Sequence, residues 1–225
     1  RAAFNRAIAA KVVSKTKNPF SEFKLSHLNI KTMKRALSKA DITKIMDADC
    51  SKQTEQRQLA HDIFCFSYLC GGISLVDIAN LTPLNIIDGR LIYQRQKTHG
   101  SINLLLSDKA MQIIAKYHRY QRIANYFFPI LHCRRHITPM QKHNRVRKMC
   151  REINRELKAL AEELGITANI TTYVARHTFA TILKKSGVNI GIISQALGHQ
   201  DIKTTQIYLS KFDNEQIDEA MKHLL

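Results

Sequence analysis

Residues 175–181 read Ala-Arg-His-Thr-Phe-Ala-Thr, residues 197–199 read Leu-Gly-His, and residues 204–208 read Thr-Thr-Gln-Ile-Tyr. The first motif lies in an apolar pattern of helical period that we expect to form a helix over residues 172 to 186. The second motif closes a shorter expected helix over residues 189 to 197, and each helix is followed or ended by a glycine. A short polar turn then leads to the tyrosine. The end of the chain is therefore expected to be mainly helical, and it is the most informative part of the sequence.

Upstream of these motifs, the sequence predicts further helices and one small sheet. Apolar residues recur at helical spacing near residues 41 to 48, 52 to 70, 75 to 81, 107 to 124 and 139 to 164. Between residues 84 and 106 the pattern becomes extended, and the turn sequences Asp88-Gly89 and Thr98-His99-Gly100 divide it into three short antiparallel strands. The expected fold class is therefore mainly α with a small three-stranded antiparallel sheet.

The charge balance of the chain predicts a polyanionic partner. Lys and Arg number 35 against 18 Asp and Glu, which gives a formal net charge of +17 and a sequence pI near 9.9 in 225 residues. Nucleic acid fits this excess better than a membrane surface, because no basic amphipathic anchor is evident. A generically basic protein is the alternative that charge alone leaves open.

The apolar content and the first residues indicate a globular, intracellular protein. Hydrophobic residues make up 44% of the chain, which is ample for a packed core. The sequence has no long apolar run, and its first residues lack the apolar centre of a signal peptide, so we expect an intracellular protein. It begins with Arg rather than Met, from which we expect that a natural amino-terminal part precedes it.

The cysteines and histidines do not predict a disulfide framework or a metal site. There are 5 cysteines, an odd number at irregular spacing, and we expect them to be reduced. The nearest approach to a metal cluster is His132-Cys133-Arg134-Arg135-His136. No CxxC pair accompanies it, and the two arginines between the candidate ligands would repel a cation.

In sequence, spacing and order, the three motifs resemble the closing signature of the tyrosine recombinases of the phage integrase family, and the resemblance covers nearly the whole chain. It implies a catalytic domain that cuts and rejoins DNA strands through a covalent 3'-phosphotyrosine intermediate, with Tyr208 as the nucleophile. Arg176 would neutralise charge on the nonbridging phosphate oxygens, and His199 would bond the scissile phosphate. Because the bond energy is kept in the protein linkage, neither a metal nor ATP nor another cofactor is expected.

The resemblance also suggests a general acid. Lys97, in the hairpin-tip sequence Gln96-Lys97-Thr98-His99-Gly100, is similar to the hairpin lysine of the family, which protonates the leaving oxygen. Arg95 lies two residues earlier on the same face of the strand, and we expect it to share the phosphate site.

Two positions depart from the family pattern and remain candidate catalytic positions. Alignment of Asp77 with the usual acidic residue places Ser74 where the family has its first arginine, and Tyr173 stands where a His or Lys is usual. Loss of a guanidinium weakens a phosphate clamp in the transition state. Loss of the first arginine is a trait of recombinases resembling those of Bacteroides mobile elements and phages, as is Cys70-Gly71-Gly72-Ile73. We therefore interpret the serine as a subfamily trait, Arg95 as a substitute for the missing arginine, and Asp77 as an acid that orients neighbouring basic residues.

Three basic residues outside these motifs are candidate DNA contacts. Arg145 and Lys148 lie on the basic face of the expected helix over residues 139 to 164, and Lys203 lies in the polar turn before the tyrosine. Such a face is usually only solvated, so phosphate contact and plain exposure to solvent both remain open.

The family resemblance implies a domain plan and an assembly. Residues 1 to 24 would end a helical DNA-clamping (core-binding) domain and its linker, residues 25 to 212 would form the catalytic domain, and residues 213 to 225 would form a tail helix. The tail would be exchanged between protomers of a homotetramer on paired sites in duplex DNA, or it would pack within its own chain. An accessory DNA-bending protein is a further expected partner, and the setting would be the bacterial cytoplasm or a phage.

Three functions remain open from the sequence. The first is an integrase or site-specific recombinase. The second is a topoisomerase-like enzyme that relaxes DNA with the same nucleophile, acting as a monomer with little sequence preference. The third is a catalytically silent DNA-binding protein of the same fold, which the two departures suggest. Covalent capture of DNA separates the first two from the third.

Overall fold

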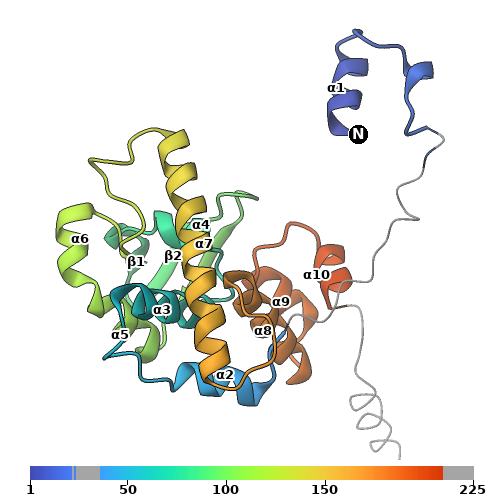
Figure 1. Ribbon diagram of the computed structural model, residues 1–225. Helices are drawn as coiled ribbons and strands as arrows, with labels where there is room; N and C mark the ends of the chain where they lie inside the picture. The colour runs from blue at the N-terminus through green and yellow to red at the C-terminus, as the bar shows by residue number, and fades with distance from the viewer. Residues whose placement is uncertain (22, 24–35, 210–225) are drawn as a thin grey trace, which may run out of the picture. The chain divides into compact units, whose positions relative to one another are not determined.

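The computed structural model describes residues 1–21, 23 and 36–209 and divides the chain into two compact units, Arg1–Lys34 and Arg35–Leu225. The first unit contains helix α1 (Ala2–Ala9) and a short 3-10 helix, η1 (Lys15–Lys17). The second unit contains the motifs singled out above (Figure 1). The expected tail helix over residues 213 to 225 lies outside the described residues.

The second unit is mainly helical, as expected. Its helices are α2 (Lys39–Met46), α3 (Glu55–Leu69), α4 (Leu75–Asn80), α5 (Asp108–Lys116), α6 (His118–Ala124), α7 (Pro139–Glu163), α8 (Thr172–Lys185), α9 (Ile190–Ala196) and α10 (Ile202–Tyr208). Hydroxyl side chains cap the start of several of them by accepting a backbone N–H, which satisfies a donor that has no partner within the helix.

Two expectations about these helices were wrong. Residues 107 to 124 form two helices rather than one, because the chain leaves helical geometry at Tyr117. The segment before Tyr208, expected as a polar turn, is helix α10. The carboxylate of Asp201 accepts a hydrogen bond from the backbone N–H of Lys203 at 2.9 Å, so this residue caps a helix.

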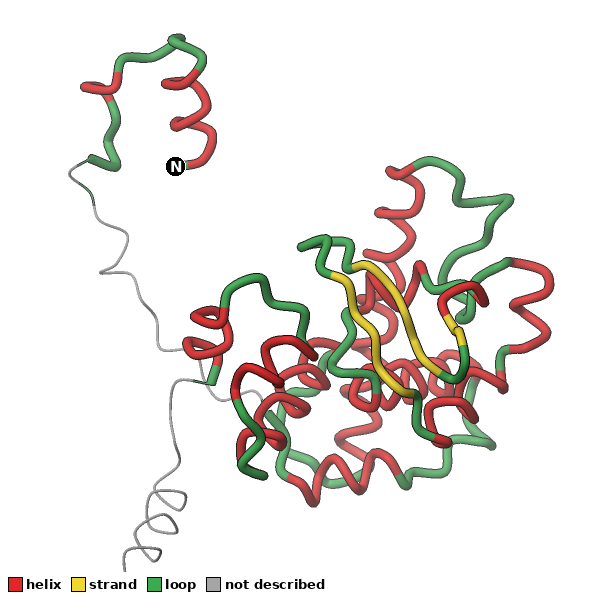
Figure 2. Tube along the Cα trace, turned by 180° about the vertical axis from the view of Figure 1, so that it is seen from behind, coloured by secondary structure: helices red, strands yellow, loops and turns green. Residues whose placement is uncertain are grey.

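The small sheet has the expected antiparallel order β1 (Ile86–Ile87), β2 (Arg90–Gln94) and β3 (Ser101–Leu105), shown in yellow in Figure 2. Leu91 and Tyr93 alternate with exposed or partly exposed residues along β2, so one face of the sheet packs on the helices. The first strand is shorter than expected, because the residues before it form a 3-10 helix, η3 (Pro83–Asn85).

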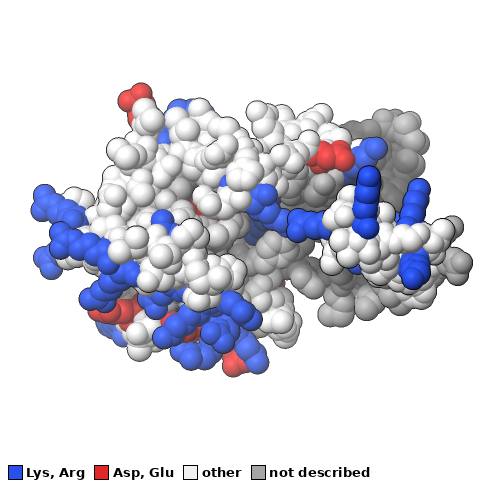
Figure 3. Space-filling model, turned by 90° about the horizontal axis from the view of Figure 1, so that it is seen from above, with Lys and Arg blue, Asp and Glu red and all other residues white. Residues whose placement is uncertain are grey.

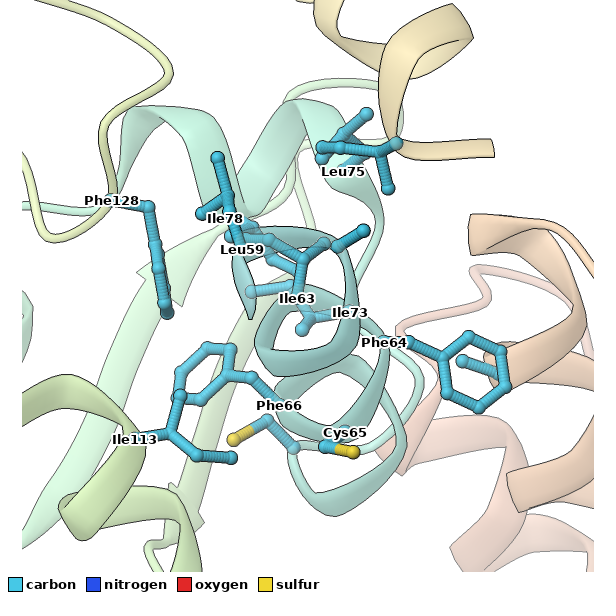
Figure 4. Packing of buried hydrophobic residues seen from close by; sticks show 14 of the residues in the cluster. Leu59, Ile63, Phe64, Cys65, Phe66, Ile73, Leu75, Ile78, Ile113 and Phe128 are labelled. Atoms are coloured by element: carbon cyan, nitrogen blue, oxygen red, sulfur yellow. The ribbon is translucent and has the colours of Figure 1, made fainter. Parts of the chain in front are cut away.

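The main hydrophobic core is centred on α3, which packs against α5, α7 and α8. Ile63, Phe64 and Phe66 on this helix are fully buried, and Phe128 lies edge-on to Phe66 with ring centroids 5.2 Å apart (Figure 4). Burial of one such side chain stabilises a fold by about 1.5–3 kcal/mol. The core therefore fixes the helix against which the site-bearing segments pack.

A second, smaller apolar cluster joins α8, α9 and the end of α10. Ala180 of α8, Ile193 and Leu197 at α9, and Leu209 after α10 are buried together. This cluster holds α10 against α8 and α9. In the described part of the chain, no helix is long and apolar enough to cross a membrane.

Candidate active site

Arg176 projects from α8 into the interior of the second unit, and only 4% of it is exposed. Its Nη1 donates to the backbone oxygen of Gly72 at 2.8 Å, and its Nη2 donates to the backbone oxygen of Leu197 at 2.5 Å. Gly72 has a φ of +68°, and a Cβ there would lie 2.8 Å from the Cα and Cγ of Arg176. The glycine is therefore required for this arginine to enter the site.

Arg95 reaches the same place from the end of β2 and is 6% exposed. Its Nη1 donates to the backbone oxygens of Leu197, at 2.9 Å, and Gly198, at 3.1 Å. Its Nε is buried without a hydrogen-bond partner, 3.8 Å from Oδ2 of Asp77. Gly198 has a φ of +61°, and a Cβ there would lie 2.5 Å from Cδ of Arg95, so this glycine makes room for the side chain.

The two guanidinium groups therefore meet at one carbonyl, that of Leu197, which follows the last residue of α9. The carbonyl end of a helix carries partial negative charge and attracts cations. Asp77 is the carboxylate paired with this site among the described ion pairs. Among the interactions of the described residues, two fixed cations thus lie near the Asp77 carboxylate and several carbonyl oxygens.

Ser74 and Asp77 support this arrangement from the start of α4. The Ser74 hydroxyl donates to Oδ2 of Asp77 at 2.6 Å and also caps the helix. Oδ1 of Asp77 accepts the backbone N–H of Gln96 at 2.8 Å, which fixes the start of the hairpin turn. Ser74 and the Arg95 guanidinium are thus neighbours of the same carboxylate oxygen.

His199 lies between Arg176 and the helix that ends at Tyr208. Its Nε2 is 3.1 Å from Nη2 of Arg176, and its Nδ1 is 2.7 Å from Oγ1 of Thr205. Burial, followed by the positive charges of Arg176, Arg95 and Lys97, lowers the pKa of His199 from 6.5 to about 4. The imidazole is therefore neutral near pH 7.

The hairpin turn holds Lys97 exposed beside this site. Thr98 Oγ1 donates to the backbone oxygen of Gly198 at 3.3 Å, and the amide of Gln200 donates to the backbone oxygen of Thr98 at 2.7 Å. These bonds tie the turn to the segment that carries His199. Tyr208 is the last residue of α10, and its side chain lies outside what the structure describes.

Tyr173 is placed differently from the buried pair of arginines. It is 49% exposed on α8, and its ring packs edge-on against His177 with centroids 4.6 Å apart. Ser74 is occupied as a helix cap and as a donor to Asp77. Neither residue supplies a cation to the site.

The three candidate DNA contacts lie apart from the arginine pair in the sequence and differ from one another. Arg145 is partly buried, and its Nε donates to the backbone oxygen of Ile130 at 3.0 Å. Lys148 has a side chain that is 61% exposed and lies 3.8 Å from Glu152, one helical turn on. Lys203 is exposed in the first turn of α10.

Sequence reasoning missed three parts of the site. Thr205 is fully buried against His199, although its sequence position next to the exposed Thr204 gave no sign of this. Its spacing of three residues from Tyr208 would have been informative if the segment had been expected to be helical. The Leu197 carbonyl and Gly72 depend on tertiary contacts, which no local motif reveals. The described residues contain no group of three or more His, Cys, Asp or Glu that could hold a metal ion.

Comparison with known proteins identifies the family. Residues 35–215 match the model of the phage integrase family. A tyrosine recombinase of Thermosipho africanus is 27% identical over 153 residues, which cover 67% of this chain and 50% of that protein. Tyrosine recombinase XerA of Saccharolobus solfataricus is 48% identical over 54 residues, 24% of this chain and 18% of that protein. The chain thus spans about half the length of the first of these relatives and less of the second.

A solved structure has the same fold. The integrase of transposon Tn1549, in complex with transposon right end DNA, superposes with a TM-score of 0.64 at 19% identity, covering 99% of this chain and 76% of that one. The expected fold class is confirmed. Because the family model matches residues 35–215, which are most of the chain, this chain belongs to the phage integrase family.

Proposed function

We propose that this chain is the catalytic part of a site-specific DNA recombinase or integrase that cuts and rejoins strands through a covalent 3'-phosphotyrosine intermediate. The observation that carries the proposal is the convergence of Arg95 and Arg176 on one carbonyl, next to His199, whose ring contacts Thr205 in the helix that ends at Tyr208. Fixed, buried guanidinium groups are suited to bind an anion, and a phosphodiester gains most in the transition state, where its charge is greatest.

The reaction follows from these groups. The phenol oxygen of Tyr208 bonds to phosphorus while the bond from phosphorus to the 5' oxygen breaks. Lys97 gives a proton to that leaving oxygen, and the phenol proton passes to solvent or to a neighbouring base. Arg176 and Arg95 hold the nonbridging oxygens. Attack by the free 5' hydroxyl of the exchanged strand reverses these steps, so the cycle needs neither a metal nor ATP.

We assign to Arg95 the place of the first arginine of the family. Ser74 occupies that place in the sequence, and the Arg95 guanidinium is next to the carboxylate to which the serine donates. A guanidinium delivered from the hairpin strand can thus meet the same phosphate oxygens. Tyr173 is not needed in this scheme.

Duplex DNA is the proposed partner. The net charge is +17, and residues 109–151 contain no Asp or Glu. Lys and Arg side chains outnumber Asp and Glu on the face seen in Figure 3. Exposed Lys148 and Lys203 are suited to phosphate contacts that orient the duplex, and Arg145 holds the loop that precedes α7 through the Ile130 carbonyl. The structural neighbour from Tn1549 is itself a DNA complex.

The domain plan and the assembly belong to the same proposal. Residues 1 to 24 end a DNA-clamping domain, residues 25 to 212 form the catalytic domain, and residues 213 to 225 exchange between protomers of a tetramer on two DNA sites. An accessory DNA-bending protein completes the assembly.

Covalent capture tests the function. The protein is incubated in chelator with a nicked suicide duplex built from the ends of the DNA element that carries its gene, and a denaturation-resistant protein–DNA band is sought. We expect the band with the wild type and with Tyr68→Phe, a tyrosine packed on the main core, and none with Tyr208→Phe.

The alternatives give different results in this assay. Tight DNA binding without a band would indicate a silent DNA-binding protein. Efficient capture on any duplex, by a monomer, would indicate a DNA-relaxing enzyme.

A further inference from the structure

We propose that Thr205 is a positioning residue that holds the proton of the neutral His199 ring on Nδ1 in the absence of DNA and locks the tyrosine helix to the phosphate site. The proposal rests on the proposed function and deepens it. It starts from one contact, the 2.7 Å approach of Thr205 Oγ1 to His199 Nδ1, in a side chain that is fully buried.

The partners of the imidazole determine where its proton lies. A guanidinium has only donors, so the His199 Nε2 that faces Nη2 of Arg176 at 3.1 Å must accept. A neutral imidazole carries one N–H, which is then on Nδ1 and points to the hydroxyl oxygen of Thr205. The lowered pKa of His199 agrees with a neutral ring in the absence of DNA.

Charged groups around the ring favour the same tautomer. Arg176, Arg95 and Lys97 are the cations that act on it, and they come from α8, the end of β2 and the hairpin turn. A proton on Nε2 would point at the Arg176 guanidinium, whereas a proton on Nδ1 points at an uncharged oxygen. Thr205 therefore supplies the acceptor that lets the ring turn its lone pair towards the arginines.

The same hydroxyl couples the ring to the nucleophile. Thr205 lies in α10, three residues and about one helical turn before Tyr208, so both residues belong to one rigid element. The bond from His199 to Thr205 thus sets the distance between the phosphate-binding groups and the backbone of the tyrosine. Leu209, buried after the end of this helix, secures its other end. A small error in this distance would slow attack while leaving DNA binding intact.

The contact is tested with Thr205→Val, which keeps the shape of the side chain but removes the hydroxyl, and with Thr205→Ser, which restores it. Thr204→Val on the exposed neighbour is the matched control. Single-turnover cleavage of the suicide duplex and DNA affinity are measured for each folded protein. We expect Thr205→Val to lose about 100-fold in cleavage rate with unchanged affinity. Thr205→Ser should recover most of that loss, and Thr204→Val should behave as the wild type.

A measurement on the wild type tests the tautomer without any variant. The ¹⁵N shifts of the His199 ring, assigned by comparison with His199→Gln, should show a protonated Nδ1 and an Nε2 with a lone pair at pH 7. The opposite tautomer, or equal cleavage by wild type and Thr205→Val, would overturn the role of Thr205 and leave the recombinase function in place. Absence of cleavage by the wild type itself would instead count against the function.

Discussion

Two buried polar clusters in the second unit are built in opposite ways. In the first, Asp62 is 2% exposed in its side chain and accepts from Lys116 Nζ at 2.8 Å and from the Tyr117 hydroxyl at 2.9 Å, with His61 Nδ1 at 3.4 Å. In this cluster, hydrogen-bond donors surround the Asp62 carboxylate. In the second, the donors of Arg95 and Arg176 converge on carbonyl oxygens, with the Asp77 carboxylate to one side.

The two histidines reflect this difference. Burial alone would lower the pKa of His61, but hydrogen bonds to Asp62, Cys65 and the Ile45 carbonyl outweigh it and raise the pKa to about 11. Burial and nearby cations lower the pKa of His199 to about 4. The first cluster contains its own anion and acts as a structural tie. In the second, two guanidinium groups share the carbonyl of Leu197, and the Asp77 carboxylate lies beside Arg95.

Removal of the Asp62 charge should have the largest effect on stability. Asp62→Asn removes the buried charge and one of the two acceptor oxygens that Lys116, Tyr117 and His61 share, and we expect a loss of about 3–5 kcal/mol in the free energy of unfolding. Asp47→Asn is the control, because its pair with Lys109 is exposed and should contribute about 1 kcal/mol or less. Urea unfolding measures both. Similar losses for the two variants would show that the buried cluster is not a structural tie.

Removal of the Arg95 charge should act on chemistry instead. For Arg95→Ala we expect single-turnover cleavage to fall about 10²- to 10³-fold, because one transition-state donor is lost, with a much smaller change in DNA affinity. Arg90→Ala, an exposed arginine on the same strand, is the matched control. Partial rescue of Arg95→Ala by Ser74→Arg would show that the two positions serve one phosphate. Equal losses of cleavage and binding in Arg95→Ala would mean that the residue merely holds DNA.

The last expected effect concerns the pH dependence of stability. Between about pH 4 and 6.5, His199 is protonated in the unfolded chain but not in the folded protein. Lowering the pH through this range therefore reduces the free energy of unfolding. The contribution of His61 is complete below pH 6.5 and is lost as the pH rises towards 11. Unfolding free energies across pH should therefore lose part of their acid slope in His199→Gln and part of their alkaline slope in His61→Gln. Curves parallel to that of the wild type would contradict the two opposite environments.

The candidate residues that the sequence offers for this site come from local motifs. Arg176, His199 and Tyr208 stand in motifs of fixed order, and the hairpin that presents Lys97 has its turn residues in the chain itself. The arrangement of the arginines could not be predicted, because Arg95 and Arg176 meet at a carbonyl supplied by a third segment. The helix α10 was missed for a different reason. It is only 7 residues long, and its buried residue that contacts His199 is a threonine rather than an apolar residue, so apolar periodicity did not reveal it.

The separation of the two apolar clusters has a consequence for the timing of the reaction. The helix that carries Tyr208 is secured by the small cluster around Ile193 and Leu209, whereas the main core lies around α3. Segments held by few buried contacts open at a lower free energy than the whole domain. We therefore expect α10 to detach and re-dock while the rest of the unit stays folded. Docking of the helix that carries Tyr208 would then be a local folding equilibrium, separate from the unfolding of the rest of the unit.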